Sequence, residues 1–240
     1  MKKPKYQRIL LKLSGELLAG KQKFGIDFNV ARTIANDLAA LAKSGCELGV
    51  VVGGGNIFRG RSIPRDSIDR ATADYMGMTA TIMNAIALQA EVERFGAHCR
   101  VLSAISMKEV AEDYIRRQAR SHLADGKIVI FAAGTGNPYF TTDTAAALRA
   151  LEVDAEVLLK ATTSVDGVYT GDPRRLGSKS KKLKQVSFRT ALTKRLRVMD
   201  STAFSLCMDN KLPVIVFRYK PGAVAEILAG KEVGTLVTQP

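Results

Sequence analysis

Three short glycine-containing segments each follow an apolar run of the length expected for a buried strand. Residues 12–15 follow residues 9–11, residues 53–56 follow residues 50–52, and residues 134–138 follow residues 128–131. A strand that ends in glycines and continues into a helix leaves free backbone N–H groups at the positive end of the helix dipole. Three such turns in one chain predict an α/β protein that binds several phosphate groups.

The composition indicates a globular protein without covalent or metal cross-links. The 240 residues are 46% hydrophobic and 25% charged, which suits a full core and is too apolar for a disordered chain. The three cysteines, Cys46, Cys99 and Cys207, form no CxxC pair, and only two histidines accompany them. This pattern argues against a structural zinc site and against a disulfide framework.

The net charge of +13 favours a partner that carries negative charge, either a nucleic acid or a nucleotide. The basic N-terminus leads into an apolar run that Lys12 interrupts and that is too short for a signal peptide. No apolar stretch approaches the roughly 20 residues of a membrane helix. The sequence therefore predicts a cytoplasmic protein with no membrane partner.

Strand and helix patterns alternate along most of the chain. We expect strands over residues 6–13, 47–52, 99–103, 127–132, 155–160, 214–217 and 235–238. We expect helices over residues 29–44, 71–95, 108–123, 142–151 and 223–228, and further helix around Asp200, after a long loop over residues 162–184. Short crossovers between the strands predict a three-layer α/β/α sandwich around a mostly parallel sheet, in a single domain with two lobes.

Several common catalytic and nucleotide-binding motifs are missing. The sequence contains neither the P-loop G-x-x-x-x-G-K-[ST] nor a G-x-G-x-x-G fingerprint with its downstream acid. His98 precedes a predicted strand and His122 lies late in a predicted helix. Neither histidine fits a Ser-His-Asp triad, and a structural role explains both.

The remaining pattern fits phosphoryl transfer to an acceptor that needs no general base, because such chemistry depends on positioning and charge neutralisation. An acceptor phosphate meets this condition, since its second pKa is about 6. Lys12 and Lys160 each end a predicted strand, so both would project from one edge of a parallel sheet. Arg59 follows the second glycine turn and suits a bidentate phosphate contact.

The lysines and glycines of these segments, and the polar residues Asp74 and Asp200, also have structural interpretations. Lys12 and Lys160 could be solvated lysines at a sheet edge, and the glycines at 53–55 could merely allow close helix packing. Asp74 could complement the dipole of its predicted helix, whose methionines are most simply core residues, and Asp200 could cap a helix. A charge embedded in Leu-Leu-Lys-Leu is unusual, and so we favour a functional role for Lys12.

Five separated motifs resemble those of the amino-acid kinase family, in the branch that phosphorylates uridylate. They cover residues 12–16, 53–60, 74–81, 134–143 and 165–173, in the family's order, and the similarity extends over residues 6–238. The resemblance implies transfer of the γ-phosphoryl group of ATP to UMP, giving UDP and ADP for pyrimidine nucleotide synthesis. It also implies a homohexamer, and it implies Mg²⁺ that enters together with ATP and occupies no dedicated metal site. It further implies an acceptor-binding lobe of about residues 1–160 and an ATP-binding lobe of residues 161–240.

The resemblance carries roles onto individual residues. Those expected at ATP are Lys12, Leu13, Ser14, Gly15, Gly55, Arg59, Thr162, Tyr169 and Asp172. Those expected at UMP are Gly54, Asp74, Thr135, Gly136, Asn137, Pro138, Tyr139, Phe140, Thr141 and Thr142. For catalysis we expect Lys12 and Lys160 to stabilise the transferred group, Arg59 to orient phosphates, and Asp143 to organise the lysines. Residues 162–165 are one residue longer than in some family members, so the assignment at Thr162 could shift by one position.

One further segment resembles the loop at which the family binds an allosteric GTP. It consists of Gly20, Lys21, Gln22, Lys23, Phe24 and Gly25, and its two lysines suit a triphosphate. A solvated basic turn explains the same residues equally well. The resemblance implies that GTP activates the enzyme and that UTP inhibits it.

Two other functions compete with this interpretation. A kinase of the same fold could act on carbamate or on an amino-acid carboxylate, although Asp74 and the loop at 134–142 resemble the nucleotide-acceptor branch. A nucleic-acid-binding regulator would use Arg116, Arg117, Arg120 and the basic run at 174–184. No segment resembles a recognition helix or an aromatic RNA-binding motif, which argues against a nucleic-acid partner.

Overall fold

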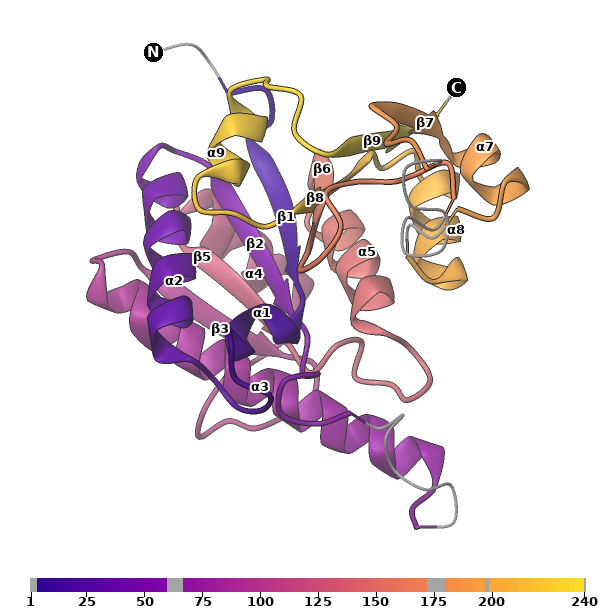
Figure 1. Cartoon of the computed structure of the whole chain (residues 1–240). Helices are drawn as coiled ribbons and strands as arrows, with labels where there is room; N and C mark the ends of the chain where they lie inside the picture. Colours follow the sequence, from indigo (N-terminus) through magenta and orange to yellow (C-terminus); the bar gives the residue numbers. More distant parts are fainter. Residues whose placement is uncertain (1–3, 60–66, 172–179, 197–198, 240) are drawn as a thin grey trace.

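The computed structural model describes residues 4–59, 67–171, 180–196 and 199–239. Its centre is a nine-stranded sheet with the strand order β4-β3-β5-β2-β1-β6-β8-β9-β7. Every neighbouring pair of strands is parallel except β8 with β9. Helices cover both faces of the sheet (Figure 1), and so the predicted three-layer α/β/α sandwich around a mostly parallel sheet is confirmed.

The bounds of most elements agree with the predicted ranges to within two residues at each end. The strands are β1 Arg8–Leu13, β2 Glu47–Val52, β3 Cys99–Ser103, β4 Glu112–Asp113, β5 Ile128–Ala132, β6 Val157–Thr162, β7 Gln185–Ser187, β8 Val214–Arg218 and β9 Thr235–Thr238. The helices are α1 Gly15–Ala19, α2 Phe28–Lys43, α3 Arg70–Arg94, α4 Arg116–Ala124, α5 Thr142–Glu152, α7 Phe188–Thr193, α8 Ser201–Asp209 and α9 Ala223–Leu228.

Polar caps explain where the long helices begin. Asp27 caps α2, Asp69 caps α3, Thr141 caps α5 and Asp200 caps α8. In each case the side chain accepts hydrogen bonds from two backbone N–H groups of the first turn, which would otherwise lack partners. The caps at Thr141 and Asp200 also fix where α5 and α8 start beside the sheet.

The central strand β1 separates the two layers of helices. Ile9, Leu11 and Leu13 are buried in the core shared with α2, α3 and α9, whereas Leu10 packs in the core shared with α4, α5 and α8. Figure 1 shows α2 and α3 on one side of the sheet and α5 and α8 on the other. Because side chains alternate along a strand, Lys12 faces the α5 layer together with Leu10.

Three local predictions were wrong or incomplete. The helix predicted over residues 108–123 begins only at Arg116, because residues 112–113 form the edge strand β4 beside β3. The segment predicted as loop and helix after residue 162 contains β7, which pairs with β9. The short helix α1 was not predicted. Edge strands of two or three residues carry little periodic signal, since long-range pairing decides them.

The methionines of α3 do not all lie in the core as predicted. Met78 is buried, but Met76 and Met83 are exposed, together with Tyr75 and Ile86. These four exposed apolar residues recur at helical spacing, so α3 has a second apolar face that the described part of the chain leaves uncovered. Among the described helices, none combines the length and the hydropathy that a bilayer span requires.

Candidate active site

Lys12 and Lys160 lie side by side on β1 and β6, and both contact one carboxylate. The two residues are register partners of the parallel pair, at its carboxyl end as predicted. Lys12 Nζ lies 2.8 Å from Asp143 Oδ1, and Lys160 Nζ donates a hydrogen bond to Asp143 Oδ2. The side chains of Lys12, Lys160 and Asp143 are only 12%, 15% and 15% exposed. We call these three residues the lysine cluster.

Burial and mutual charge set the protonation of the lysine cluster. Burial opposes the charge of Asp143, but the charges and hydrogen bonds of Lys12 and Lys160 outweigh it and hold the pKa of Asp143 below its usual value. Burial also lowers the pKa of Lys160, and the neighbouring Lys12 charge acts in the same direction against the pull of Asp143. Within the lysine cluster two ammonium groups face one carboxylate, and the nearby Asp200 acts on Lys160 in the same direction as Asp143; two ammonium groups held together suit a phosphoryl group.

Asp200 joins α8 to the start of α5, next to the lysine cluster. Its carboxylate caps α8 and also accepts hydrogen bonds from the hydroxyls of Thr141, at 2.5 Å, and Thr144, at 3.0 Å. From the sequence, Asp200 is a weaker catalytic candidate, because capping already explains an aspartate at the start of a helix. The added threonine contacts fix the turn that carries Asp143.

The glycines at residues 15 and 53–55 pack directly against one another. A Cβ atom on Gly15 would lie 2.5 Å from the carbonyl oxygen of Gly53 and 2.8 Å from the backbone nitrogen of Gly55. A Cβ on Gly54 would lie 2.8 Å from the carbonyl oxygen of Gly77 in α3. Only glycine, which has no Cβ, allows the backbone segments to come this close to one another. Gly15 and residues 53–55 therefore form one backbone surface, the glycine cradle, while Gly54 also permits the close helix packing considered above.

The other residues that are expected to bind phosphates surround the glycine cradle, and they differ in which of their groups can reach a ligand. Leu13 is buried in the core, so only its backbone can face a ligand. Ser14 precedes α1, and its hydroxyl makes no capping hydrogen bond there. Arg59 is 56% exposed, and its guanidinium bonds to the carbonyl of Gly55 at 2.8 Å and to Glu16 at 2.8 Å. Arg59 therefore lies over the cradle on an exposed ion pair that a phosphate can replace.

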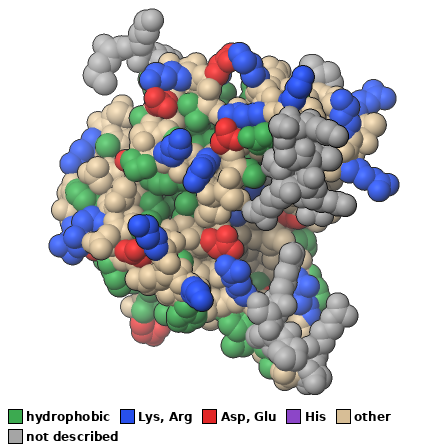
Figure 2. All heavy atoms as spheres, in the orientation of Figure 1, with side chains coloured by type: hydrophobic (Ala, Val, Ile, Leu, Met, Phe, Trp, Pro, Cys, Tyr) green, Lys and Arg blue, Asp and Glu red, His purple; other side chains and the backbone are tan. Residues whose placement is uncertain are grey.

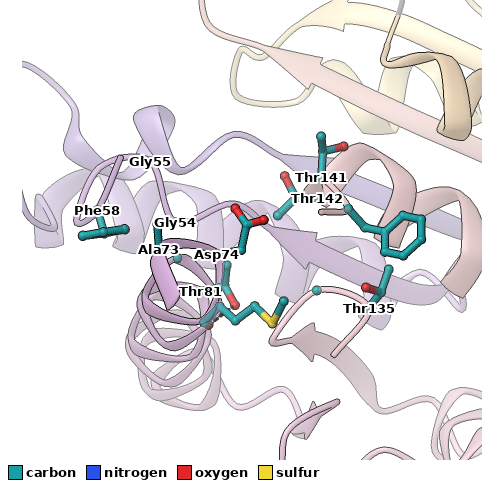
Figure 3. Close-up of a pocket in the computed structure, with 13 residues that line it drawn as sticks. Gly54, Gly55, Phe58, Ala73, Asp74, Thr81, Thr135, Thr141 and Thr142 are labelled. Atoms are coloured by element: carbon teal, nitrogen blue, oxygen red, sulfur yellow. Dashed lines mark hydrogen bonds between the residues drawn. The ribbon is translucent and has the colours of Figure 1, made fainter. Parts of the chain in front are cut away.

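A pocket beside the lysine cluster opens between α3, the glycine cradle and the start of α5 (Figure 3). It is lined by Gly54, Gly55, Phe58, Ala73, Asp74, Gly77, Met78, Thr81, Gly134, Thr135, Phe140, Thr141 and Thr142. We call it the α3 pocket. Six of these residues were assigned to the acceptor from the sequence: Gly54, Asp74, Thr135, Phe140, Thr141 and Thr142. Thr142 immediately precedes Asp143, so the pocket adjoins the lysine cluster.

Asp74 points into the α3 pocket from the second turn of α3, with Thr135, Thr141 and Thr142 across from it (Figure 3). The single N–H of Arg70 Nε is shared between the two carboxylate oxygens of Asp74, at 2.9 and 2.8 Å, and the backbone N–H of Tyr139 donates to one of them at 2.7 Å. Because Asp74 bridges α3 and the loop at 134–140, it does more than complement a helix dipole. A carboxylate in such a pocket can accept hydrogen bonds from hydroxyl groups of a ligand.

The remaining acceptor candidates form the loop that ends at Tyr139. Thr135 and Asn137 bond to each other within a tight turn, and a Cβ on Gly136 would lie 2.9 Å from the carbonyl oxygen of Ala104. Tyr139 has φ 74° and an exposed ring. Gly136, Asn137, Pro138 and Tyr139 are not among the residues that line the pocket. They shape the loop that brings Thr135 and Phe140 to it.

The predicted adenosine residues lie at the carboxyl end of β6, where Thr162 is the last residue of the strand, and in the segment that follows it. The Thr162 hydroxyl donates a hydrogen bond to the carbonyl of Val165, and the Tyr169 hydroxyl donates to Asp166 at 2.6 Å. The hydrogen bond to Asp166 raises the pKa of Tyr169. Asp172 lies outside the described residues. Thr162 is thus at the same edge of the sheet as the lysine cluster, next to β8, and the neighbour of Tyr169, Val168, bonds to Thr235 at the start of β9.

The segment from Gly20 to Gly25, which resembles a GTP-binding loop, contacts Asn56, the residue that follows the glycine cradle. Gly25 N–H donates to the carbonyl of Asn56 at 2.8 Å. Gly20, Gln22 and Lys23 line a shared hollow with Glu16, Ala19, Asn56, Arg59 and Thr163. Phe24 is exposed. The segment therefore lies beside residues that are expected to bind the phosphates of ATP, such as Arg59.

Sequence reasoning missed the residues of α3 and its neighbours that complete the pocket. Gly77, Met78 and Thr81 follow Asp74 at spacings of three, four and seven, which places all of them on one helical face. The Thr81 hydroxyl also accepts the backbone N–H of Ala133 at 2.8 Å, just before the loop at 134–140. The helical spacing from Asp74 could have identified them.

No group of three metal-ligating side chains occurs among residues 4–59, 67–171, 180–196 and 199–239. Asp143 is engaged by two lysines and Asp200 by two threonines. A hard cation such as Mg²⁺ therefore fits this site only if a ligand supplies most of the oxygen atoms around it.

The chain is similar to known kinases over nearly its whole length. Residues 7–218 match the amino acid kinase family. A UMP kinase from Bacillus anthracis superposes with a TM-score of 0.93 at 37% identity, over 97% of this chain and 96% of that one. A UMP kinase from Ureaplasma parvum gives 0.92 at 36% identity, over 100% of both chains. A uridylate kinase from Archaeoglobus fulgidus gives 0.75 at 25% identity, over 96% and 99%.

Proposed function

Because the chain belongs to the amino acid kinase family, we propose that it is a UMP kinase, which transfers the γ-phosphoryl group of ATP to UMP and releases UDP and ADP. The observation that carries this proposal is the adjacency of three parts: a buried pair of lysines on one carboxylate, a glycine cradle, and a pocket with an inward-pointing carboxylate. The first two suit a triphosphate, and the third suits a nucleoside monophosphate.

The proposed reaction needs no general base, because the acceptor phosphate of UMP is already largely ionised at neutral pH. An oxygen of that phosphate attacks the γ-phosphorus of ATP in line, and the bond to the leaving β-phosphate oxygen breaks. Lys12 and Lys160 stabilise the negative charge on the transferred group, and Arg59 orients the phosphates. Asp143 acts through the lysines, since its carboxylate holds both ammonium groups toward one point.

We assign ATP to the lysine cluster, the glycine cradle and the end of β6. Its phosphates would contact Lys12, the backbone of Leu13, Ser14 and Gly15, Gly55 and Arg59, and its adenosine would lie near Thr162, Tyr169 and Asp172. Mg²⁺ would be held mainly by phosphate oxygens and water, and it supplies charge neutralisation when bound. The exposed pair of Arg59 with Glu16 supports this assignment, because a phosphate can displace the carboxylate.

We assign UMP to the α3 pocket. Asp74 would accept hydrogen bonds from the ribose hydroxyls, Gly54 would allow close approach of the phosphate, and the loop and cap from Thr135 to Thr142 would hold the base. In this proposal the acceptor and the phosphates of ATP lie in the lobe of about residues 1–160, and the adenosine of ATP lies in the lobe of residues 161–240.

The regulation, oligomeric state and cellular location that the family resemblance implies are part of the same proposal. We propose activation by GTP through the residues from Gly20 to Gly25 and inhibition by UTP. We also propose a homohexamer, which the exposed apolar face of α3 supports because such a face favours self-association. An enzyme that uses cytoplasmic nucleotides would work in the cytoplasm.

Figure 2 shows basic side chains spread among acidic ones over the visible face, a distribution that does not favour a nucleic-acid groove.

The proposal is tested by ADP release with ATP, Mg²⁺ and one acceptor at a time. The acceptors are UMP, CMP, AMP, carbamate, aspartate and N-acetylglutamate, each with and without GTP. Turnover confined to UMP supports the proposal, and stimulation by GTP supports the regulatory part. Turnover with carbamate or an amino acid in place of UMP would retain the fold and overturn the acceptor.

A further inference from the structure

Two buried amides, Asn56 and Asn84, lie next to the glycine cradle. Asn56 is 3% exposed, and Asn84, on α3, is 0% exposed. Their side chains bond to each other twice: Asn84 Nδ2 donates to Asn56 Oδ1 at 2.7 Å, and Asn56 Nδ2 donates to Asn84 Oδ1 at 3.0 Å. A buried amide is costly unless its polar atoms are paired, so this arrangement requires both asparagines.

Each amide uses its second N–H on the backbone of a glycine segment. Asn84 Nδ2 donates to the carbonyl of Gly53 at 2.7 Å, and Asn56 Nδ2 donates to the carbonyl of Gly25 at 2.9 Å. The backbone of Asn56 accepts from Gly25 N–H in return, at 2.8 Å. All four amide hydrogens therefore have partners within the chain, and no N–H of the pair is left for a ligand.

The amide pair also contacts the first glycine turn. A Cβ on Gly15 would lie 2.6 Å from Asn56 Oδ1. Asn56 is thus wedged between Gly15 and Asn84, while Asn84 holds Gly53. The two asparagines join both halves of the cradle to α3, and they join the cradle to Gly25.

We propose that Asn56 and Asn84 are positioning residues for the donor phosphates. They fix the turn at 53–55 relative to Gly15, so that the backbone N–H groups of both segments meet one phosphate chain. The inference rests on the proposed function, because it requires ATP at the glycine cradle. It assigns no contact with ATP to either side chain, since both act through the backbone that they hold.

The test separates positioning from general stability by comparing ATP affinity with Tm in matched variants. Asn84→Ala leaves the amide of Asn56 buried without its partner and should lower Tm. The double variant N56A/N84A removes that orphaned amide and should recover part of the Tm. Glu91→Gln is the control, because Glu91 is a buried polar residue of the same helix that pairs with Arg32 and Arg94, away from the cradle.

The readout is direct binding of ATP by calorimetry in the absence of any acceptor, on folded protein below each Tm. We expect both asparagine variants to bind ATP about tenfold more weakly, a change of about 1.4 kcal/mol, and Glu91→Gln to bind it as the unmodified protein does. ATP affinity that follows Tm across all variants, or that is unchanged in N56A/N84A, would overturn the inference. Failure of the unmodified protein to bind ATP would instead overturn the proposed function.

Discussion

Lys12 and Lys160 are register partners on adjacent parallel strands, and the two oxygens of Asp143 contact their ammonium groups one each. The carboxylate comes from the first turn of α5, which Thr141 and Asp200 hold in place. Three separate elements therefore fix two positive charges at one point of the sheet edge. A rigid arrangement of this kind stabilises transition-state charge without reorganisation during the reaction.

Removing one ammonium group should impair chemistry more than binding. We expect Lys160→Met to lower kcat by about 100-fold to 1,000-fold with small changes in both KM values, because the lost contact is strongest in the transition state. Lys127→Met is the control, since Lys127 pairs with Asp125 at the far end of the sheet. Steady-state kinetics check the prediction. An equal kcat for Lys160→Met and Lys127→Met would contradict it.

Activity should fall at a lower alkaline pH than it would if the pKa of Lys160 had the usual lysine value. Burial and the Lys12 charge lower the pKa of Lys160, so its positive charge is lost as pH rises through that lowered value. The pKa of Asp143 is held low, so this carboxylate stays ionised and causes no acid limb near neutral pH. The profile of kcat against pH measures this limb. Lys160→Arg, which keeps its charge, should move the limb upward, and an unmoved limb would exclude Lys160 as its source.

Asp74→Asn should chiefly weaken the binding of the acceptor, UMP. The substitution keeps the size of the side chain and removes the charge that accepts hydrogen bonds, a loss of about 1.5–3 kcal/mol. We therefore expect the KM for UMP to rise about tenfold to 100-fold while the KM for ATP changes little. Asp69→Asn is the matched control, since Asp69 caps the same helix and an asparagine can also cap it. Equal increases of the two KM values in Asp74→Asn would remove Asp74 from acceptor binding.

Two glycines of the cradle should differ in their tolerance of a methyl group. Gly15→Ala places a Cβ within 2.5 Å of the Gly53 carbonyl oxygen, and we expect it to destabilise the fold by about 1–3 kcal/mol. Gly55→Ala meets no atom of the described residues within 4 Å and should leave the free energy of unfolding nearly unchanged. Denaturant unfolding measures both. Similar stabilities of the two variants would show that the close contact at Gly15 relaxes freely.

Arg149 should stabilise the loop beside the α3 pocket from within the core. It bonds to Glu152 at 2.6 Å and to the carbonyl of Gly134 at 3.3 Å, and its guanidinium lies 3.8 Å from the ring centre of Tyr114. Arg149→Met removes the partner of the Gly134 carbonyl and leaves Glu152 with only the hydroxyl of Tyr114, and it should cost about 3 kcal/mol of stability. Arg120→Met, which breaks only an exposed pair with Asp154, should cost less than about 1 kcal/mol. Thermal unfolding would contradict this account if the two variants melted alike.

The sequence was informative where a local pattern determines structure. Strand ends predicted that Lys12 and Lys160 share an edge, because parallel strands with short crossovers leave their carboxyl ends together. Asp143 has no such local signal. It was assigned through the resemblance, and its contacts with both lysines depend on how α5 packs over β1 and β6.

Long-range packing decided the features that the sequence did not predict. Asn84 and Thr81 share the helical face of Asp74, yet no local pattern distinguishes a polar residue that bonds to a loop from one that faces solvent. Met76 and Met83 follow an apolar spacing as Met78 does, but the sheet covers only one side of α3. The strands β4 and β7 exist because β3 and β9 offer them an edge.

Phosphoryl transfer by the lysine cluster is tested most directly by following the labelled γ-phosphoryl group of ATP in a single turnover with UMP. We expect the label to appear in UDP, and we expect Lys160→Met to bind ATP and UMP but to transfer the label far more slowly. Label that appears only as inorganic phosphate, or transfer by Lys160→Met at the rate of the unmodified protein, would contradict the assignment of phosphoryl transfer to the Lys12, Asp143 and Lys160 cluster.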